Sequence, residues 1–204
     1  MVRFHPDPQK IFLLSKTMSA EHPRVPITVF CSAETPSDSI VQATRELGTL
    51  LGDNGCSLVW GASNKGLMEI IASSVQKAGG ELFGVTTTLF AHQARPNIDK
   101  LISTDTLGER IQQMRDMGEA IVLLPGGIGS LQEISQLLNE KKAGLHNKPV
   151  AVLNTDGFWN PLKEQIERIE RDGFLPRGMK VEDLVVFVDT PQEVIDYLDT
   201  QLRH

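Results

Sequence analysis

The sequence has little of what marks a secreted, metal-binding or membrane protein. Its 204 residues include two cysteines, Cys31 and Cys56, and no CxxC pair or Cys/His group with zinc-ligand spacing. We therefore expect two free thiols and no metal site. No apolar run approaches the roughly 20 residues of a membrane span, and the apolar run at 11–14 is too short for a signal-peptide core. These absences predict a cytoplasmic protein without a membrane partner.

The sequence also has fewer positively charged than negatively charged side chains. Lysine and arginine together number 20 against 26 aspartates and glutamates, so the formal net charge is −6. Nucleic-acid binding needs a basic face, so we expect no nucleic-acid partner. A small anionic ligand is compatible with this balance, because a local nest of backbone N–H groups and one arginine can outweigh a distant net charge.

Short apolar segments alternate with amphipathic segments along most of the chain. The short segments are apolar on both faces, which is typical of strands in a parallel sheet covered by helices on both sides. Strands are expected at 27–31, 57–60, 82–86, 120–124, 150–154 and 184–188, with room for another short strand within 88–104. Helices are expected at 37–54, from the loop 61–66 to about 78, and at 107–117, 130–143, 161–171 and 191–202. The sequence thus predicts an α/β fold with a doubly wound parallel sheet.

Domain organisation follows from the same pattern. Residues 1–25 are rich in proline, histidine and charge, and we interpret them as an N-terminal extension. The rest of the chain contains no internal repeat, low-complexity tract or linker. Residues 26–204 are therefore expected to form a single domain.

The segment 120–133 carries the strongest functional pattern. Five apolar residues lead to Pro125 and a glycine-rich turn, and Ser130 and Glu133 follow three residues apart. The pattern predicts a buried strand, a loop whose backbone approaches a ligand, and a helix whose first N–H groups point at the same place. We expect a nucleotide phosphate there, with Glu133 facing the sugar. The predicted phosphate contacts are Gly126, Gly127, Gly129 and Ser130.

Two further loops, at 32–37 and 61–66, also follow predicted strands. In parallel α/β sheets, ligand sites lie beyond the carboxyl ends of the strands, so the three loops can converge on one crevice. Ser32, Ala33 and Gly61 are therefore candidate contacts of the nucleotide. The chain has no GxxxxGK[ST] motif, which disfavours ATP hydrolysis.

These segments together resemble the LONELY GUY (LOG) family, whose members were long labelled as lysine decarboxylases. Residues 125–133 are similar to the family motif PGGxGTxxE, and residues 60–68 are similar to its YGGGxxGLM loop. Residues 108–110 fall where the family has its MHERK helix, and 144–149 match a stretch that usually follows the main motif. The resemblance covers about residues 26–200.

The resemblance implies a Rossmann-like nucleotide-binding catalytic domain, usually a homodimer with its sites near the subunit interface. It implies an N-glycosidase that uses no cofactor and cleaves a nucleoside 5′-monophosphate into free base and ribose 5-phosphate. The usual substrate is an AMP-like nucleotide of cytokinin biosynthesis, a cytokinin riboside monophosphate. By position, Arg110 and Glu133 would be the catalytic pair. The sequence departs from the family pattern at Ala62, Glu69, Leu107, Gly108 and Ile111.

The candidate side chains also have structural interpretations. Ser130 and Glu133 form an S-x-x-E pattern, which is typical of a capping box at the start of a helix. Arg110 could clamp the phosphate, orient Glu133 or be a solvated helix arginine. Arg115 could reach the phosphate or lie at the surface or an interface. Met114 could line the base pocket or belong to the core.

Other functions compete with this hypothesis. One is the same hydrolysis acting on another nucleotide, such as AMP or CMP. Another is a non-catalytic nucleotide-binding or carrier protein of the same fold. A pyridoxal-phosphate-dependent decarboxylase is disfavoured, because no lysine of the chain lies in a matching context.

Overall fold

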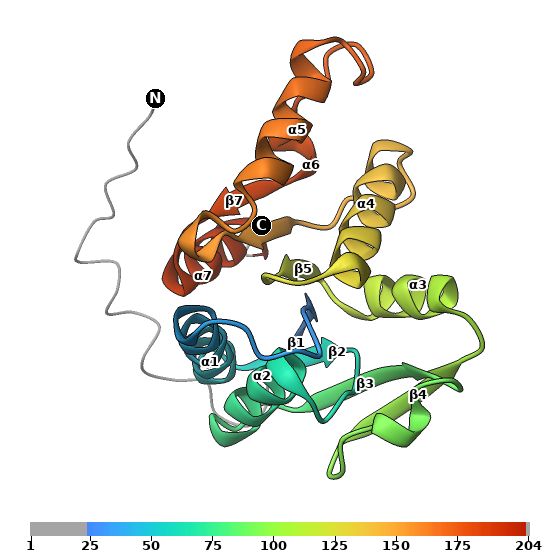
Figure 1. Ribbon diagram of the computed structural model, residues 1–204, viewed down its shortest axis with the longest axis vertical. Helices are drawn as coiled ribbons and strands as arrows, with labels where there is room; N and C mark the ends of the chain where they lie inside the picture. The colour runs from blue at the N-terminus through green and yellow to red at the C-terminus, as the bar shows by residue number, and fades with distance from the viewer. Residues whose placement is uncertain (1–23, 203–204) are drawn as a thin grey trace.

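The structure is a computed structural model that describes residues 24–202. In this part of the chain, seven strands form one sheet in the order β4-β3-β2-β1-β5-β6-β7, and every neighbouring pair is parallel (Figure 1). The strands are β1 (Val25–Phe30), β2 (Cys56–Trp60), β3 (Leu82–Thr87), β4 (Lys100–Thr104), β5 (Ala120–Leu123), β6 (Val150–Leu153) and β7 (Val186–Val188). This arrangement confirms the predicted Rossmann-like α/β fold with a doubly wound sheet.

Helices cover both faces of the sheet, as a parallel sheet requires. One face is covered by α1 (Asp38–Asp53), α2 (Gly66–Lys77) and α7 (Pro191–Leu202). The other face is covered by α3 (Leu107–Met117), α4 (Ile128–Lys142), α5 (Asn160–Arg171) and the short α6 (Val181–Leu184). Two 3₁₀ turns, η2 (Ala91–Gln93) and η3 (Thr155–Gly157), follow β3 and β6. None of the helices described in residues 24–202 has both the length and the apolar character needed to cross a membrane.

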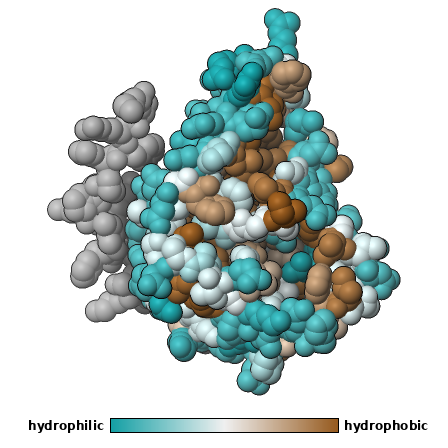
Figure 2. Space-filling model, in the orientation of Figure 1, coloured by the Kyte–Doolittle hydropathy of each residue, from teal (hydrophilic) through white to brown (hydrophobic). Residues whose placement is uncertain are grey.

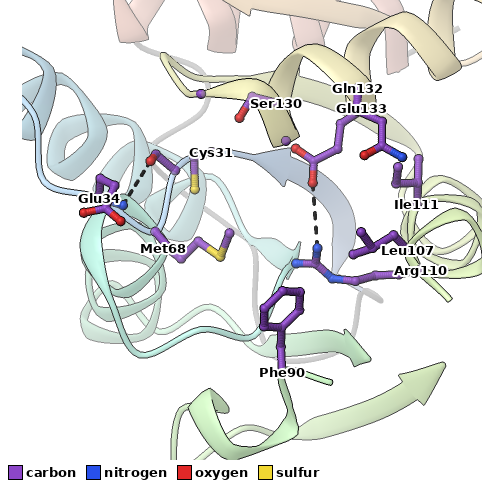
Figure 3. A pocket seen from close by; sticks show the side chains of 14 residues that line it. Cys31, Glu34, Met68, Phe90, Leu107, Arg110, Ile111, Ser130, Gln132 and Glu133 are labelled. Carbon is purple, nitrogen blue, oxygen red and sulfur yellow. Dashed lines mark hydrogen bonds and ion pairs between the residues drawn. The ribbon is translucent and has the colours of Figure 1, made fainter. Parts of the chain in front are cut away.

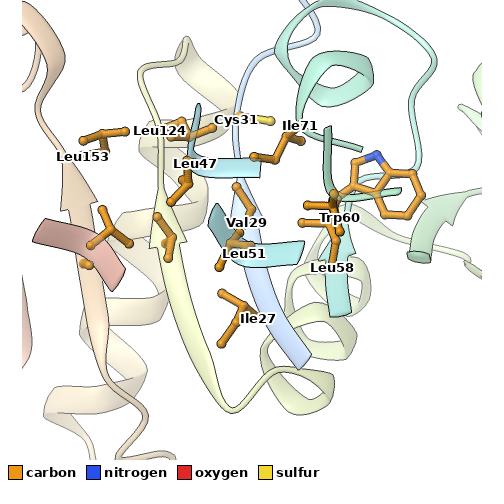
Figure 4. Packing of buried hydrophobic residues seen from close by; sticks show 14 of the residues in the cluster. Ile27, Val29, Cys31, Leu47, Leu51, Leu58, Trp60, Ile71, Leu124 and Leu153 are labelled. Atoms are coloured by element: carbon orange, nitrogen blue, oxygen red, sulfur yellow. The ribbon is translucent and has the colours of Figure 1, made fainter. Parts of the chain in front are cut away.

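Side chains of the strands alternate between two apolar cores. In β1, Ile27 and Val29 enter the core under α1 and α2 (Figure 4), whereas Phe30 packs on the opposite face. In β5, Val122 and Leu123 divide in the same way. All five are at most 1% exposed, and burial of each stabilises the fold by roughly 1.5–3 kcal/mol. The sheet therefore gives the loops at its carboxyl edge a firm base.

The strand order creates a switch point between β1 and β5. The chain runs outward from β1 through β2 and β3 to β4, and then returns through α3 to add β5 on the other side of β1. Connections that leave two neighbouring strands in opposite directions open a crevice beyond their carboxyl ends, where such sheets bind ligands. Here the crevice lies between the loop after Phe30 and the loop after Leu123.

The structure corrects two expected boundaries near the ends of the chain. β1 begins at Val25 and so takes in the last residue of the predicted N-terminal extension, of which 1–23 lie outside the described residues. The strand expected at 184–188 is shorter, because the short helix α6 occupies its start. The Val185 N–H donates to the Val181 carbonyl at 2.9 Å, so the strand begins only after this turn.

Candidate active site

A cavity of about 300 Å³ lies beyond the carboxyl ends of β1 and β5 (Figure 3). Its volume is at the lower end of the roughly 300–1,000 Å³ found for small-molecule sites. Its wall combines the loop after β1, the first turn of α2, the connection from β3 to β4, and the facing ends of α3 and α4. The predicted site residues that line it are Arg110, Glu133, Ser32, Ala33, Gly127, Gly129 and Ser130.

The first turn of α4 faces this cavity with free backbone N–H groups. Its hydrogen bonds begin where the Leu131 N–H donates to the Gly127 carbonyl at 3.1 Å, which leaves the N–H groups of the preceding residues without an intrahelical partner. A Cβ added at Gly127 or Gly129 would meet nothing within 4 Å, so the space before the helix is open. Free N–H groups and the positive end of the helix dipole together make this turn suited to a phosphate.

The second glycine-rich junction, at the start of α2, is already occupied. The N–H groups of Leu67 and Met68 donate to the carbonyls of Glu34 and Ser32, each at 3.2 Å. Gly66 permits this close approach with a φ of +55°, since a Cβ there would lie 2.2 Å from the carbonyl carbon of the neighbouring loop. The loop after β1 thus caps α2, and of these two junctions only the start of α4 is open to an anion.

Glu133 and Arg110 face each other across the cavity from α4 and α3 (Figure 3). Arg110 Nη1 lies 3.8 Å from Glu133 Oε1, which is an ion pair without a hydrogen bond. The Nε of Arg110 donates instead to the Val85 carbonyl at 2.9 Å, which fixes the guanidinium against β3. Arg110 is 8% exposed and Glu133 is 7% exposed. The protein therefore buries two groups of opposite charge in the wall of the cavity.

Burial controls the protonation of this pair. Burial raises the pKa of Glu133 to about 7, and the positive charge of Arg110 opposes the rise without cancelling it. Burial also lowers the pKa of Arg110, against the attraction of Glu133. A carboxyl group that titrates near neutral pH suits proton transfer, and such perturbed groups in a cavity are typical of catalytic sites.

The capping-box interpretation of Ser130 and Glu133 is wrong. The N-cap of α4 is Gly127, which has no side chain to form a capping hydrogen bond, and Ser130 lies buried inside the first turn. A capping box occurs instead on α3, where Thr106 Oγ1 accepts from the Glu109 N–H at 3.1 Å and the Glu109 carboxylate accepts from the Thr106 N–H at 3.2 Å. Glu133 is therefore free of the structural task that the pattern suggested.

Gly126 affects the cavity through Ser130, which lines it. A Cβ at Gly126 would lie 2.1 Å from Ser130 Oγ, so a side chain at this position would push the Ser130 hydroxyl from its place. Gly61 has a similar relation to Arg110, as its Cβ would lie 1.9 Å from Nη2. Among the described residues, neither glycine lines the cavity itself.

Two predicted nucleotide contacts lie elsewhere. Met114 is 1% exposed in the core beneath α3, and its carbonyl accepts a hydrogen bond from Thr28 Oγ1 at 2.7 Å. Arg115 points away from the cavity and pairs with Glu140 and Asp116, each at 2.7 Å. Neither side chain lines the cavity in the described part of the chain, so the expected contact of the two with the nucleotide stays a prediction. The helical period explains the place of Arg115, which lies five residues after Arg110 and so on another face of α3. Met114, four residues after Arg110, shares its face but is buried in the core against the sheet.

Several cavity residues escaped the sequence-based prediction, namely Cys31, Glu34, Met68, Phe90, Leu107, Ile111 and Gln132. Cys31 could have been found, because it directly follows a predicted strand. Phe90 could not, because it comes from the irregular connection between β3 and β4. Both cysteines are free, and burial raises the pKa of each thiol. Residues 24–202 contain no group of three His, Cys, Asp or Glu side chains suited to a metal.

The fold and the site define a class of protein: a Rossmann-like α/β protein whose cavity at the sheet's switch point holds a buried carboxylate and guanidinium. A family model described as "Possible lysine decarboxylase" matches residues 68–198. Curated relatives over most of the chain are named as phosphoribohydrolases. The chain belongs to this family, the LOG family.

Two relatives show the extent of the similarity. The cytokinin riboside 5′-monophosphate phosphoribohydrolase of Mycobacterium tuberculosis is 30% identical over 172 residues, covering 83% of this chain and 90% of its own. The protein of the same name from Mycobacterium marinum is 29% identical over 187 residues, covering 91% of this chain and 95% of its own.

Solved structures share the fold at lower identity. The molybdenum cofactor binding protein of Rippkaea orientalis superposes with a TM-score of 0.68 at 21% identity, covering 90% of this chain and 99% of that chain. The Moco carrier protein of Chlamydomonas reinhardtii gives 0.66 at 22% identity, covering 88% and 98%. These likenesses concern the architecture and not a shared ligand.

Proposed function

We propose that this protein hydrolyses the N-glycosidic bond of a nucleoside 5′-monophosphate and releases free base and ribose 5-phosphate. One observation carries the proposal: the buried Glu133 carboxyl group, with its pKa raised to about 7, faces Arg110 in the cavity at the switch point. The names of the relatives support the same reaction.

The phosphate binds at the start of α4. The free N–H groups of its first turn, the glycines 127 and 129 and the Ser130 hydroxyl supply donors without adding bulk. Gly126 keeps the Ser130 hydroxyl in place. Glu133 lies one helical turn further along the same helix, so a phosphate held at the first turn brings the attached ribose toward its carboxylate.

The reaction breaks the bond between C1′ of the ribose and a nitrogen of the base. The bonding electron pair leaves with the base, and positive charge develops at C1′. In its ionised form, Glu133 stabilises that charge and takes a proton from the water whose oxygen bonds to C1′. The base takes up the proton that Glu133 removes from water, which restores the ionised carboxylate. Arg110 orients the carboxylate or holds an oxygen of the substrate, since its planar fork suits either task.

The base lies at the apolar side of the cavity. Met68, Phe90, Leu107 and Ile111 form this wall, which suits a flat heterocycle and an apolar substituent. An N6-substituted AMP, the cytokinin-type substrate named for the relatives, is therefore the first substrate to test. AMP and CMP are the second choice, because two of these wall residues, Leu107 and Ile111, depart from the family pattern.

The remaining predictions concern the whole protein. We propose a homodimer, and the exposed apolar side chains Leu107, Ile128 and Leu131 beside the cavity support it, at 41%, 82% and 37% exposure. Figure 2 shows hydrophobic surface over the adjoining ends of α3 and α4. The single catalytic domain over 26–204 and the cytoplasmic location stay predictions, and one continuous sheet supports the former.

A carrier function is the second candidate, because two of the solved structures of like fold are named as a cofactor binding protein and a cofactor carrier protein. A binding protein needs the open first turn of α4 for the phosphate, but it does not need a carboxyl group whose pKa is near 7. A lysine decarboxylase is disfavoured by the residues, because no lysine in the described part of the chain lines the cavity to bond pyridoxal phosphate.

Incubation of the purified protein with nucleoside 5′-monophosphates separates these functions. The panel holds N6-isopentenyl-AMP, AMP, CMP, GMP and UMP, and the assays measure ribose 5-phosphate and free base. Equal amounts of both products are the expected result, and the fastest substrate identifies the base. Saturable nucleotide binding without either product would favour the carrier instead.

A further inference from the structure

Gly61 directly follows β2 and lies against the side chain of Arg110. A Cβ built on Gly61 would be 1.9 Å from Arg110 Nη2 and 3.1 Å from its Cζ. Non-bonded heavy atoms do not approach to 1.9 Å, so any side chain at position 61 would displace the guanidinium. The missing side chain at this position is therefore part of the geometry around Arg110.

The guanidinium has little room to move elsewhere. Its Nε donates to the Val85 carbonyl at 2.9 Å, and its side chain is 10% exposed. The Met68 sulfur would lie 3.0 Å from the same added Cβ, so it closes another side of this space. A residue larger than glycine would therefore have to break the hydrogen bond to Val85 or turn the guanidinium away from Glu133.

We propose that Gly61 is a positioning residue, whose missing side chain forms a notch that holds the Arg110 guanidinium beside Glu133. The proposal rests on the proposed hydrolysis for its effect on rate. It gives position 61 a role that acts through Arg110 and not through contact with the nucleotide. The glycine that the sequence suggested as a ligand contact thus serves the catalytic pair.

The variant Gly61→Ala tests this role. A displacement of about 1 Å at a catalytic group can cost about 100-fold in rate, so kcat should fall by about this factor. KM should change much less, because the substitution leaves the first turn of α4, the proposed phosphate site, unchanged. The midpoint of the pH–rate profile should move to higher pH, because Glu133 loses the nearby charge that lowers its pKa.

Gly108→Ala is the matched control. Gly108 lies on α3, the helix that carries Arg110, but it is exposed, and a Cβ there would meet no atom closer than Thr106 Oγ1 at 4.0 Å. The control should keep the wild-type kcat and pH midpoint. Wild-type values of both quantities in Gly61→Ala as well would overturn the proposal.

A double-mutant cycle with Arg110→Ala separates the notch from a direct role of Gly61. Without the guanidinium there is nothing to displace, so Gly61→Ala should then change neither the residual kcat nor the melting temperature. In the wild-type background the same substitution should lower both. Independent, additive losses would mean that Gly61 acts by itself, and would overturn the proposal.

The melting temperatures measured in the same cycle distinguish failure of this proposal from failure of the proposed function. If the wild type hydrolyses no nucleotide, the proposed function fails, but coupling in melting temperature still reports the contact between Gly61 and Arg110. If Gly61→Ala alone does not fold, the double variant Gly61→Ala/Arg110→Ala should fold. Failure of the double variant as well, with Arg110→Ala itself folded, would contradict the notch.

Discussion

The Nη1 atom of Arg110 lies 3.8 Å from Oε1 of Glu133, close enough for attraction and too far for a hydrogen bond. The hydrogen bond of this guanidinium goes to the Val85 carbonyl instead. Neither buried charge is therefore fully compensated, which is why burial outweighs attraction in the pKa of Glu133. A pair in this state can turn its remaining hydrogen-bonding capacity toward a substrate in the cavity that both residues line.

The raised pKa of Glu133 predicts a pH-dependent stability. Folding raises the pKa of Glu133 from 4.5 to about 7, so the folded state binds the proton more tightly. Between these values the unfolding free energy of the wild type should fall as pH rises, and then level off. Glu133→Gln lacks this loss, so its stability relative to wild type should grow by about 1–3 kcal/mol across the range.

Urea unfolding at about pH 5 and about pH 8 measures this difference. The control is Glu167→Gln, which changes an exposed glutamate of α5 and should leave the difference flat. A Glu133→Gln variant whose relative stability is the same at both pH values would show that the carboxyl group titrates normally.

Arg115 is predicted to support the fold and not the reaction. Arg115→Met removes the partner of Glu140, whose side chain is 14% exposed, and should lower the unfolding free energy by about 3 kcal/mol. The kcat/KM should stay at the wild-type value, because Arg115 does not line the cavity. Thermal unfolding and steady-state kinetics test the two parts. A loss of nucleotide binding without a loss of stability would instead place Arg115 at the phosphate.

The connection from β3 to β4 is predicted to tune substrate affinity. Arg95 in this connection donates from Nε to Glu69 at 2.9 Å and from Nη2 to Gln76 at 2.9 Å, which ties Phe90 and its neighbours to α2. Glu69→Ala should loosen the wall that Phe90 forms and raise KM roughly three- to tenfold, with little change in kcat.

Lys77→Ala, on an exposed position of α2, is the control and should alter neither kinetic constant. Limited proteolysis gives a second measurement, because a loosened connection should be cut faster within 88–99. Unchanged KM together with unchanged cleavage in Glu69→Ala would show that this ion pair does not hold the wall.

The apolar surface beside the cavity predicts an interface. Ile128 is 82% exposed on the first turn of α4, although it stands between two glycines of the cradle. Ile128→Glu places a charge there and should convert the proposed homodimer to a monomer, measured by light scattering over a range of concentrations. Monomeric wild-type protein under the same conditions would contradict the predicted dimer.

The sequence predicted those parts of the site that are contiguous in the chain. The strand, glycine turn and helix around Gly127 have local signatures, and the apolar segments predicted the sheet. Arg110 has no such signature, because an arginine on an amphipathic helix is ordinary. Its assignment came from the resemblance alone, and only the fold brings it beside Glu133.

Other parts of the site depend on contacts between residues far apart in the chain, which no local sequence pattern contains. The S-x-x-E pattern points to Ser130 as the N-cap, whereas the N-cap of α4 is Gly127. Glycine is an accepted N-cap residue but also occurs in other turns, so no local pattern marks Gly127 as the start of the helix. Phe90 reaches the cavity through an irregular connection held by Arg95. The helical register of α3, and not its composition, decides that Arg115 points away.

Ribose 5-phosphate release by Glu133→Gln, compared with wild type across the pH range and under saturating nucleotide, tests the catalytic role of Glu133. The wild-type rate should rise with pH through a midpoint near 7, as the Glu133 carboxyl group ionises. The variant should bind the same nucleotide, lose at least about 1,000-fold in rate above pH 7, and show no rise in rate through the wild-type midpoint. Turnover by Glu133→Gln at the wild-type rate, with the wild-type pH profile, would contradict catalysis of N-glycosidic hydrolysis by Glu133.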